Sequence, residues 1–132
     1  MVLRNGFVDV SVSVMPSIEA FKHDPSALQL GAGQTVFEEG AAGNEMYVVV
    51  AGEVELRLGD RLLDVAGPGQ MFGEMALVDH VTRSASAITR TAATIVPVDR
   101  RRFLYLIQNT PYFAIEVMKT MADRLRRMDA RK

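Results

Sequence analysis

The sequence predicts a mainly β fold with flanking helices. We expect an antiparallel, jelly-roll-like β-roll that contains one short helix and is followed by two C-terminal helices. Three observations support this expectation: glycine punctuates short apolar segments over residues 27–98, several segments alternate apolar with polar residues, and the pattern becomes helical after Pro97. Short strands at this spacing favour an antiparallel roll, because a parallel sheet would place a longer helix between strands.

The length indicates a single domain, since 132 residues is the usual size of one. We divide residues 1–132 into an N-terminal extension (1–26), a roll (27–98) and C-terminal helices (99–132). Turns are expected where glycine clusters, at residues 31–33, 40–43, 59–60 and 67–69. The predicted strands are rich in Val, Ile, Tyr and Phe and cover residues 27–30, 34–39, 45–50, 53–58, 61–65, 84–89 and 92–98.

Both ends of the chain carry recognisable patterns. Asp99 is a predicted N-cap, followed by an apolar helix face of Phe103, Leu104, Leu106 and Ile107. Thr110 and Pro111 then predict a second N-cap and a proline at the first helical position. This second helix has an amphipathic stripe that packs on the roll, forms a dimer seam, or does both; it comprises Ala114, Val117, Met118, Met121, Leu125 and Met128. Before the roll, alternation over residues 8–14 predicts a strand that Pro16 ends, and residues 17–22 predict a short helix.

Charge and composition limit the function classes. Residues 1–99 carry six Lys/Arg and thirteen Asp/Glu, hence −7, whereas residues 100–132 carry nine and three, hence +6. The basic end attracts nucleic acid or an acidic partner, or it is a solvated helix face. Cysteine is absent, and neither a membrane span nor a signal peptide is visible, so we expect a cytoplasmic protein without membrane contact. The two histidines, His23 and His80, do not suggest a metal centre, and no nucleophile elbow suggests an enzyme.

One stretch, residues 72–86, has the chemistry of an anion cradle, and we call it the cassette. Gly73 lets a ligand approach the backbone, and residues 74–78 can start a helix with free N–H groups. Arg83 offers a planar fork for two phosphate oxygens, and Ser84 a hydroxyl donor. The Glu74 carboxylate only accepts hydrogen bonds, which suits a sugar hydroxyl. From the residues alone, an Arg83–Glu74 salt bridge that closes a turn explains the pattern equally well.

The cassette resembles the phosphate-binding cassette of the cyclic nucleotide-binding domain family. That family includes the catabolite activator proteins, the regulatory subunits of cAMP-dependent protein kinase and the cyclic-nucleotide-gated channels. Its motif runs Phe-Gly-Glu, an aliphatic residue, Ala-Leu, a variable loop, then Arg, one of Ser, Thr or Ala, and Ala. This sequence matches each of those positions. Upstream glycines also fall at the family's turns: Gly33, Gly40, Gly43 and Gly52. The resemblance covers about residues 27–128.

The resemblance implies a role for each matching residue. Glu74 binds the ribose 2′-hydroxyl, and Arg83 binds the equatorial oxygens of the cyclic phosphate. Backbone N–H groups of Met75 and Ala76, with the Ser84 hydroxyl, complete the phosphate shell beside Gly73. Four further residues face the purine or sugar, unless they are ordinary core: Leu56, Leu63, Met71 and Ala85. In the last helix, either Arg127 or Met128 caps the base.

The function we expect is that of a regulatory sensor that binds cAMP, with cGMP as the other candidate ligand, and needs no cofactor. It acts through its C-terminal helices on an unidentified protein partner or a second copy. We expect the basic face of the last helix (Lys119, Arg124, Arg126, Arg127) to meet that partner. The activator proteins continue into a helix-turn-helix, but the sequence stops at Lys132, so we expect no specific DNA binding. The alternative is a structural or interaction roll that no longer responds to ligand.

Overall fold

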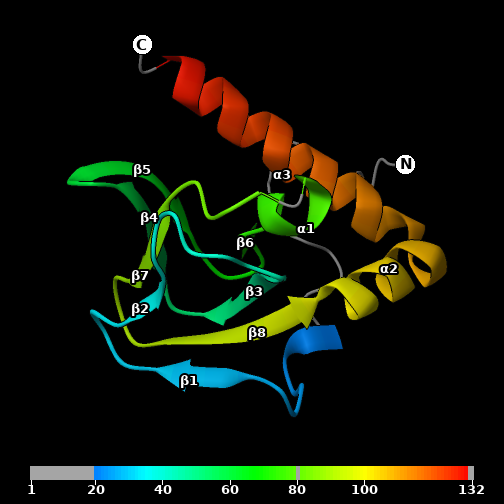
Figure 1. The fold of residues 1–132 in the computed structure, drawn as a ribbon. Helices are drawn as coiled ribbons and strands as arrows, with labels where there is room; N and C mark the ends of the chain where they lie inside the picture. The colour runs from blue at the N-terminus through cyan, green and yellow to red at the C-terminus, as the bar shows by residue number, and fades with distance from the viewer. Residues whose placement is uncertain (1–19, 80, 131–132) are drawn as a thin grey trace, which may run out of the picture.

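The computed structural model of the chain describes residues 20–79 and 81–130, the side chains of 128–130 excepted (Figure 1). The strand predicted over residues 8–14 lies outside the described residues. So does the first half of the helix predicted over residues 17–22; of its second half, residues 20–21 are in 3₁₀ conformation.

In the described part of the chain, eight short strands form two antiparallel sheets that face each other (Figure 1). The first sheet has the order β1 (Leu28–Leu30), β8 (Ala93–Asp99), β3 (Glu45–Ala51) and β6 (Met71–Phe72). The second has the order β2 (Thr35–Phe37), β7 (Ser86–Thr89), β4 (Val54–Leu58) and β5 (Arg61–Ala66). The predicted mainly β class with flanking helices is confirmed.

Each predicted strand has an observed counterpart whose ends lie within two residues of those predicted, and two differences bear on the cassette. The strand expected from residue 84 begins at Ser86, because Ser84 and Ala85 form a bend that belongs to the cassette. Strand β6 was not predicted, since its two residues are too few to show a period. It pairs with β3 through Tyr47 and Val48, and this pairing joins the start of the cassette to the first sheet.

Strand β3 reads as a nearly continuous apolar run because it lies inside the first sheet and is buried on both faces. Met46 and Val48 point to a core that the helices cover, which also contains Phe21, Phe103 and Phe113. The alternate residues, Tyr47 and Val49, point between the two sheets. The sheet therefore separates a helix-side core from an intersheet core.

The two C-terminal helices form as predicted. Helix α2 (Arg100–Asn109) is capped by Asp99, whose carboxylate accepts a hydrogen bond of 2.8 Å from the Arg102 backbone N–H. Helix α3 (Pro111–Ala130) begins at the predicted proline. In Figure 1, α3 runs back from α2 across the cassette towards β5, with its C-terminal half above the second sheet. None of the helices within residues 20–79 and 81–130 combines the length and apolarity needed to cross a bilayer.

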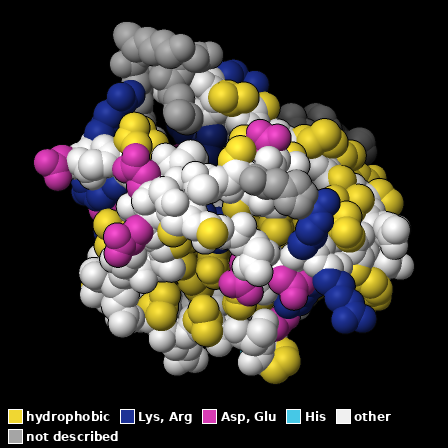
Figure 2. All heavy atoms as spheres, viewed as in Figure 1, with side chains coloured by type: hydrophobic (Ala, Val, Ile, Leu, Met, Phe, Trp, Pro, Cys, Tyr) yellow, Lys and Arg dark blue, Asp and Glu magenta, His cyan; other side chains and the backbone are white. Residues whose placement is uncertain are grey.

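The buried face of α3 differs from the predicted stripe. Phe113 and Val117 are buried, whereas Met118 and Leu125 are 59% and 62% exposed. The side of α3 that faces the roll also contains Arg124. Polar contacts as well as apolar residues therefore determine which side of the helix faces the roll. In α2, Leu104 is exposed although Phe103 is buried. Figure 2 shows exposed apolar side chains gathered where α2 and α3 lie, among them Leu104, Tyr105, Tyr112, Ile115 and Met118.

Candidate functional site

A cavity of about 290 Å³ lies between the second sheet, the cassette and α3. Its volume suits a small organic ligand. The roll supplies apolar side chains to it, the cassette supplies Glu74 and Arg83, and α3 supplies two further arginines. Its lining is Phe37, Leu56, Leu58, Leu63, Asp64, Gly73–Ala76, Thr82–Ala85, Met121, Arg124, Leu125 and Arg127.

The cassette backbone starts a short helix directly at the cavity. Gly73 has φ of 80°, a conformation that favours glycine, and a Cβ there would lie 2.9 Å from Arg83 Nη1. The Glu74 carbonyl then accepts from the N–H groups of Leu77 and Val78 at 3.0 and 3.1 Å and so begins α1 (Met75–Asp79). The N–H groups of Met75 and Ala76 have no hydrogen-bond acceptor among the described residues, as is usual in a first helical turn.

Arg83 is held from both sides of its backbone and is 6% exposed. Its N–H donates to the Ala41 carbonyl, and its own carbonyl accepts from Gly40, each at 2.8 Å. In the side chain, Nη1 donates to the Gly73 carbonyl at 3.0 Å and Nη2 to the Glu45 carbonyl at 2.8 Å. The Nε atom is buried and has no hydrogen-bond partner among the described residues.

Two neighbours shape the space around the Arg83 guanidinium. The Phe37 ring lies below it, with 4.0 Å between the guanidinium carbon and the ring centroid. Gly43 lies beside it, and a Cβ there would be only 2.3 Å from Arg83 Nε. A side chain at residue 43 would displace the guanidinium, so the glycine is required by close approach.

Burial lowers the pKa of Arg83, and the nearby charges of Tyr47, Glu45 and Glu74 oppose this effect. The guanidinium stays charged, because arginine begins from a very high pKa. Burial also raises the pKa of the Tyr47 phenol, and Glu45 adds to this shift. Within the described residues Arg83 has no carboxylate partner at ion-pair distance. The site therefore holds a buried cation whose charge is balanced only at a distance.

Glu74 is buried too, at 4% exposed, and points to α3 rather than to Arg83. Its Oε1 accepts from Arg124 Nη1 at 2.9 Å. The Arg83–Glu74 salt bridge that the residues alone left open is not formed among the described contacts. The two cassette side chains thus keep separate partners at the edge of one cavity.

Arg124 is the main site residue that the sequence reasoning misplaced. We expected it on a basic face towards a partner, but its side chain is 13% exposed and faces the cavity. Besides Glu74, it bonds Asp64 through Nε at 2.8 Å and the Met71 carbonyl through Nη2 at 2.6 Å. Its spacing of seven from Val117, two helical turns, was the signal for its inward position. Asp64 was also missed, because a lone carboxylate in a strand has no distinguishing pattern.

The structure brings most of the predicted lining residues together. Leu56, Leu63 and Ala85 line the cavity, as do Gly73, Met75, Ala76 and Ser84 of the cassette. Met71 does not: its side chain is 1% exposed in the helix-side core, because β6 alternates and only Phe72 faces between the sheets. Of the two predicted base caps, Arg127 lines the cavity, and the side chain of Met128 lies outside the described residues.

Within the described part of the chain, no three His, Asp or Glu side chains lie together as ligands for a metal ion. The polar groups of the cavity instead form a pair of regions. Arg83 and the first N–H groups of α1 make one end, which we call the phosphate end after the role that the sequence predicts for it. Asp64, Arg124 and Arg127 make the other, which we call the base end because Arg127 is one of the predicted base caps. Apolar side chains from β4 and β5 lie between them.

Comparison with known proteins agrees with this geometry. The family profile described as "Cyclic nucleotide-binding domain" matches residues 27–110. The CRP-like cAMP-activated global transcriptional regulator of Mycobacterium tuberculosis is 36% identical over 100 residues, covering 72% of this chain and 45% of that protein. The cyclic AMP receptor protein of Thermus thermophilus is 37% identical over 102 residues, covering 74% of this chain and 47% of that protein. The chain spans about half the length of these curated relatives.

The fold has the same neighbours. The crystal structure of the Thermus thermophilus catabolite activator protein superposes with a TM-score of 0.73 at 30% sequence identity. The superposition covers 88% of this chain and 57% of that chain.

Proposed function

Since the chain belongs to the cyclic nucleotide-binding domain family, we propose that its cavity binds a 3′,5′-cyclic nucleotide, cAMP in preference to cGMP. The protein then acts as a sensor without a cofactor, and binding, not catalysis, is its activity. We choose cAMP because two relatives are a cAMP-activated transcriptional regulator and a cyclic AMP receptor protein.

The observation that carries the proposal is the buried Arg83 Nε without a partner. A buried donor left unpaired costs free energy, and a charged one costs more. A cyclic phosphate offers one negative charge and several acceptors, so it satisfies Nε and balances the guanidinium. The free N–H groups of Met75 and Ala76 and the Ser84 hydroxyl supply further donors at the same end of the cavity.

The rest of the cavity suits the remainder of the ligand. The Glu74 side chain accepts one hydrogen bond, from Arg124, and has acceptor capacity left for the ribose 2′-hydroxyl. Leu56, Leu63 and Ala85 offer an apolar wall to the sugar and purine. Ser84 keeps a hydroxyl but lacks the methyl of the threonine that favours guanine in similar cassettes, and this supports a modest cAMP preference.

We also propose how the signal leaves the domain. Helix α3 crosses the cavity and carries two of its arginines. A bound nucleotide therefore stabilises the arrangement in which α3 lies over the cavity, relative to an arrangement in which it does not. The exposed side of α3 then meets a protein partner or a second copy of the chain. Specific recognition of DNA by the residues of this chain is not part of the proposal.

Calorimetric titration of the purified protein with cAMP, cGMP and 5′-AMP tests the proposal. We expect cAMP to bind more tightly than cGMP, and 5′-AMP to bind far more weakly. The open phosphate carries a second charge and does not have the shape of the ring that the cassette encloses. Equal binding of cAMP and 5′-AMP, or no heat with either cyclic nucleotide, would contradict the proposal. A tenfold preference for cGMP would overturn the base assignment alone.

A further inference from the structure

Asp64 occupies a position at the base end of the cavity that the proposed roles leave unused. It lies on β5 directly opposite Leu56 of β4, and residues paired in this way project from the same face of the sheet. Both side chains line the cavity. The Asp64 side chain is 14% exposed, so it is a carboxylate largely withdrawn from water beside an apolar wall.

Two arginines from α3 converge on a single oxygen of this carboxylate. Asp64 Oδ2 accepts from Arg124 Nε and from Arg127 Nη2, both at 2.8 Å. Burial favours the neutral acid, but the hydrogen bonds from Arg127 and Arg124 prevail and lower the pKa of Asp64. The carboxylate therefore carries the charge that both guanidiniums require.

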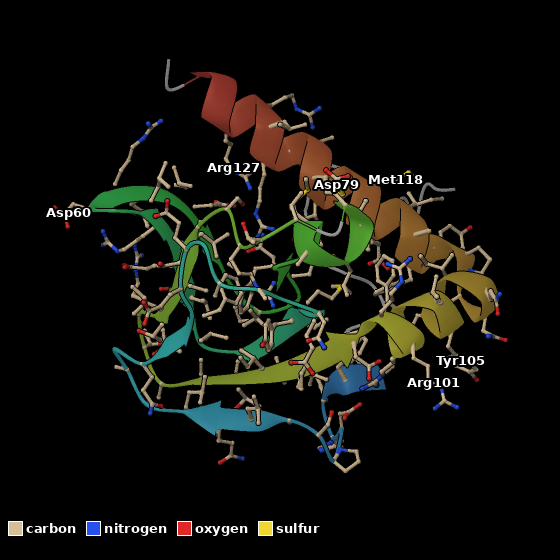
Figure 3. All side chains as sticks on the ribbon, in the orientation of Figure 1. Asp60, Asp79, Arg101, Tyr105, Met118 and Arg127 are labelled. Carbon is tan, nitrogen blue, oxygen red and sulfur yellow. The ribbon has the colours of Figure 1, made fainter. Side chains whose placement is uncertain are left out.

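The two arginines depend on Asp64 to different degrees. Arg124 has other anchors in Glu74 and the Met71 carbonyl. Arg127 bonds no described residue except Asp64, although it lines the cavity and is 44% exposed. Figure 3 shows Arg127 reaching down from α3 towards the roll. Because a long side chain loses rotamer freedom when it is fixed, Asp64 is what keeps Arg127 over the cavity.

We propose that Asp64 is the positioning residue of the base end: it holds the Arg127 guanidinium across the cavity as a planar cover for the nucleotide base. A guanidinium stacks well on an aromatic face, and its cation is attracted to the π-system. The same carboxylate steadies Arg124 behind Glu74, so it couples α3 to both base and ribose. This inference rests on the proposed function, because it needs a base in the cavity.

The experiment compares cAMP with a ribose 3′,5′-cyclic phosphate that has no base, using calorimetry on the full chain. The variants are Asp64→Asn, Asp64→Glu, Arg127→Ala and the double variant Asp64→Asn/Arg127→Ala. Asp60→Asn is the matched control: it makes the same change in the same hairpin, and Figure 3 shows Asp60 at the tip of the hairpin, away from α3. Thermal melting of each variant checks that the fold is retained.

We expect Asp64→Asn to weaken cAMP binding about five- to thirtyfold and the base-free ligand clearly less, since a charge-assisted hydrogen bond at a partly exposed site is lost. Arg127→Ala should weaken cAMP alone, and the double variant should lose less affinity than the sum of the two single losses, because Asp64 acts largely through Arg127. Asp64→Glu should recover part of the affinity, and Asp60→Asn should match wild type. A merely structural role for Asp64 would weaken both ligands equally.

The inference is overturned if Asp64→Asn binds cAMP within twofold of wild type, if both ligands weaken equally, or if the Asp64 and Arg127 effects simply add. These outcomes leave the proposed function standing, because the wild-type protein still binds cAMP. Failure of the wild type to bind either cyclic ligand is a different result: it removes the proposed function, and this inference with it.

Discussion

The two ends of the cavity are built by different means. At the phosphate end, Arg83 is enclosed by the roll, with its backbone tied to Gly40 and Ala41 and its guanidinium to the carbonyls of Gly73 and Glu45. At the base end, Asp64 meets Arg124 and Arg127 across the gap between β5 and α3. One end is fixed by the roll itself, and the other exists only while α3 lies across it.

On the proposed function, this difference assigns most of the binding affinity to the phosphate end and the response of α3 to the base end. A preformed phosphate end contributes binding energy without ordering new groups, which favours affinity. A base end made of two elements lets ligand shift the equilibrium of α3, which is the requirement for a sensor. We therefore expect substitutions at the phosphate end to abolish binding, and substitutions at the base end to reduce affinity and alter the response.

The largest expected effect is that of Arg83→Ala. Truncating one member of a buried, charge-assisted contact costs about 2–5 kcal/mol, so cAMP binding should weaken by about 30-fold to several thousandfold. Arg83→Lys should also weaken it, since a point charge does not replace the planar fork. Arg90→Ala is the control, because Arg90 pairs with Glu55 on the outer side of the second sheet. Calorimetry in which Arg83→Ala stays within threefold of wild type would show that phosphate binds elsewhere.

Gly43→Ala tests whether the phosphate end is preformed as tightly as we infer. The new methyl would lie 2.3 Å from Arg83 Nε, and the pinned guanidinium must move to make room. Overpacking of this kind costs about 1–3 kcal/mol, or roughly 5- to 150-fold in affinity. Gly31→Ala is the control, because its methyl would meet only Gln34 Oε1 at 3.8 Å. Unchanged cAMP affinity in Gly43→Ala would mean that Arg83 is not held in one position.

Arg124→Ala and Glu74→Gln probe the junction between the two ends. Removing Arg124 leaves Glu74 without its partner at 2.9 Å, so the carboxylate becomes less well oriented for the ribose. We expect cAMP to bind about five- to thirtyfold more weakly in each variant. Titration with 2′-deoxy-cAMP should show reduced discrimination against the missing hydroxyl. Full discrimination in Glu74→Gln would assign the hydroxyl to another residue.

The smallest effect on binding is expected far from both ends, at the Asp24–Arg102 ion pair. The hydrogen bond from Arg102 lowers the pKa of Asp24 from 3.8 to about 2, against the opposing effect of burial. Because the folded pKa lies below the unfolded one, this pair stabilises the fold above about pH 4–5, and the contribution is lost as the pH falls towards 2.

Asp24→Asn should therefore lower the free energy of unfolding at pH 7 by about 1 kcal/mol, given that Arg102 is 34% exposed, and leave cAMP affinity unchanged. Denaturant unfolding at pH 7 and pH 3 measures this. The difference between Asp24→Asn and wild type should shrink at the lower pH. An equal difference at both values would show that the ion pair is not the source of stability.

The phosphate end was predictable because its determinants lie close together in the sequence. Gly73, Glu74 and Arg83 fall within eleven residues, and local rules for glycine, helix starts and anion binding act on such a segment. The strands other than β6 and the two C-terminal helices were predictable for the same reason, since each has its own period and turn residues.

The base end was not predictable in this way. Asp64 and Arg127 are 63 positions apart, and nothing in either neighbourhood indicates the other. The rotation of α3 was misjudged because apolar residues alone were used to define its inward face, whereas Arg124 occupies part of it. We predicted Met71 in the cavity because the sequence does not reveal the pairing of β6 with β3. That pairing decides which face of the sheet each β6 residue points to.

Hydrogen exchange with and without cAMP tests most directly that both ends take part in binding. Amides over residues 73–85 and 121–127 should exchange more slowly with cAMP, and those of β1 should not change. Protection of the cassette with unchanged exchange in α3 would contradict the role of the base end. Absence of protection in the cassette would contradict the central claim, because the phosphate end would then not be where the nucleotide binds.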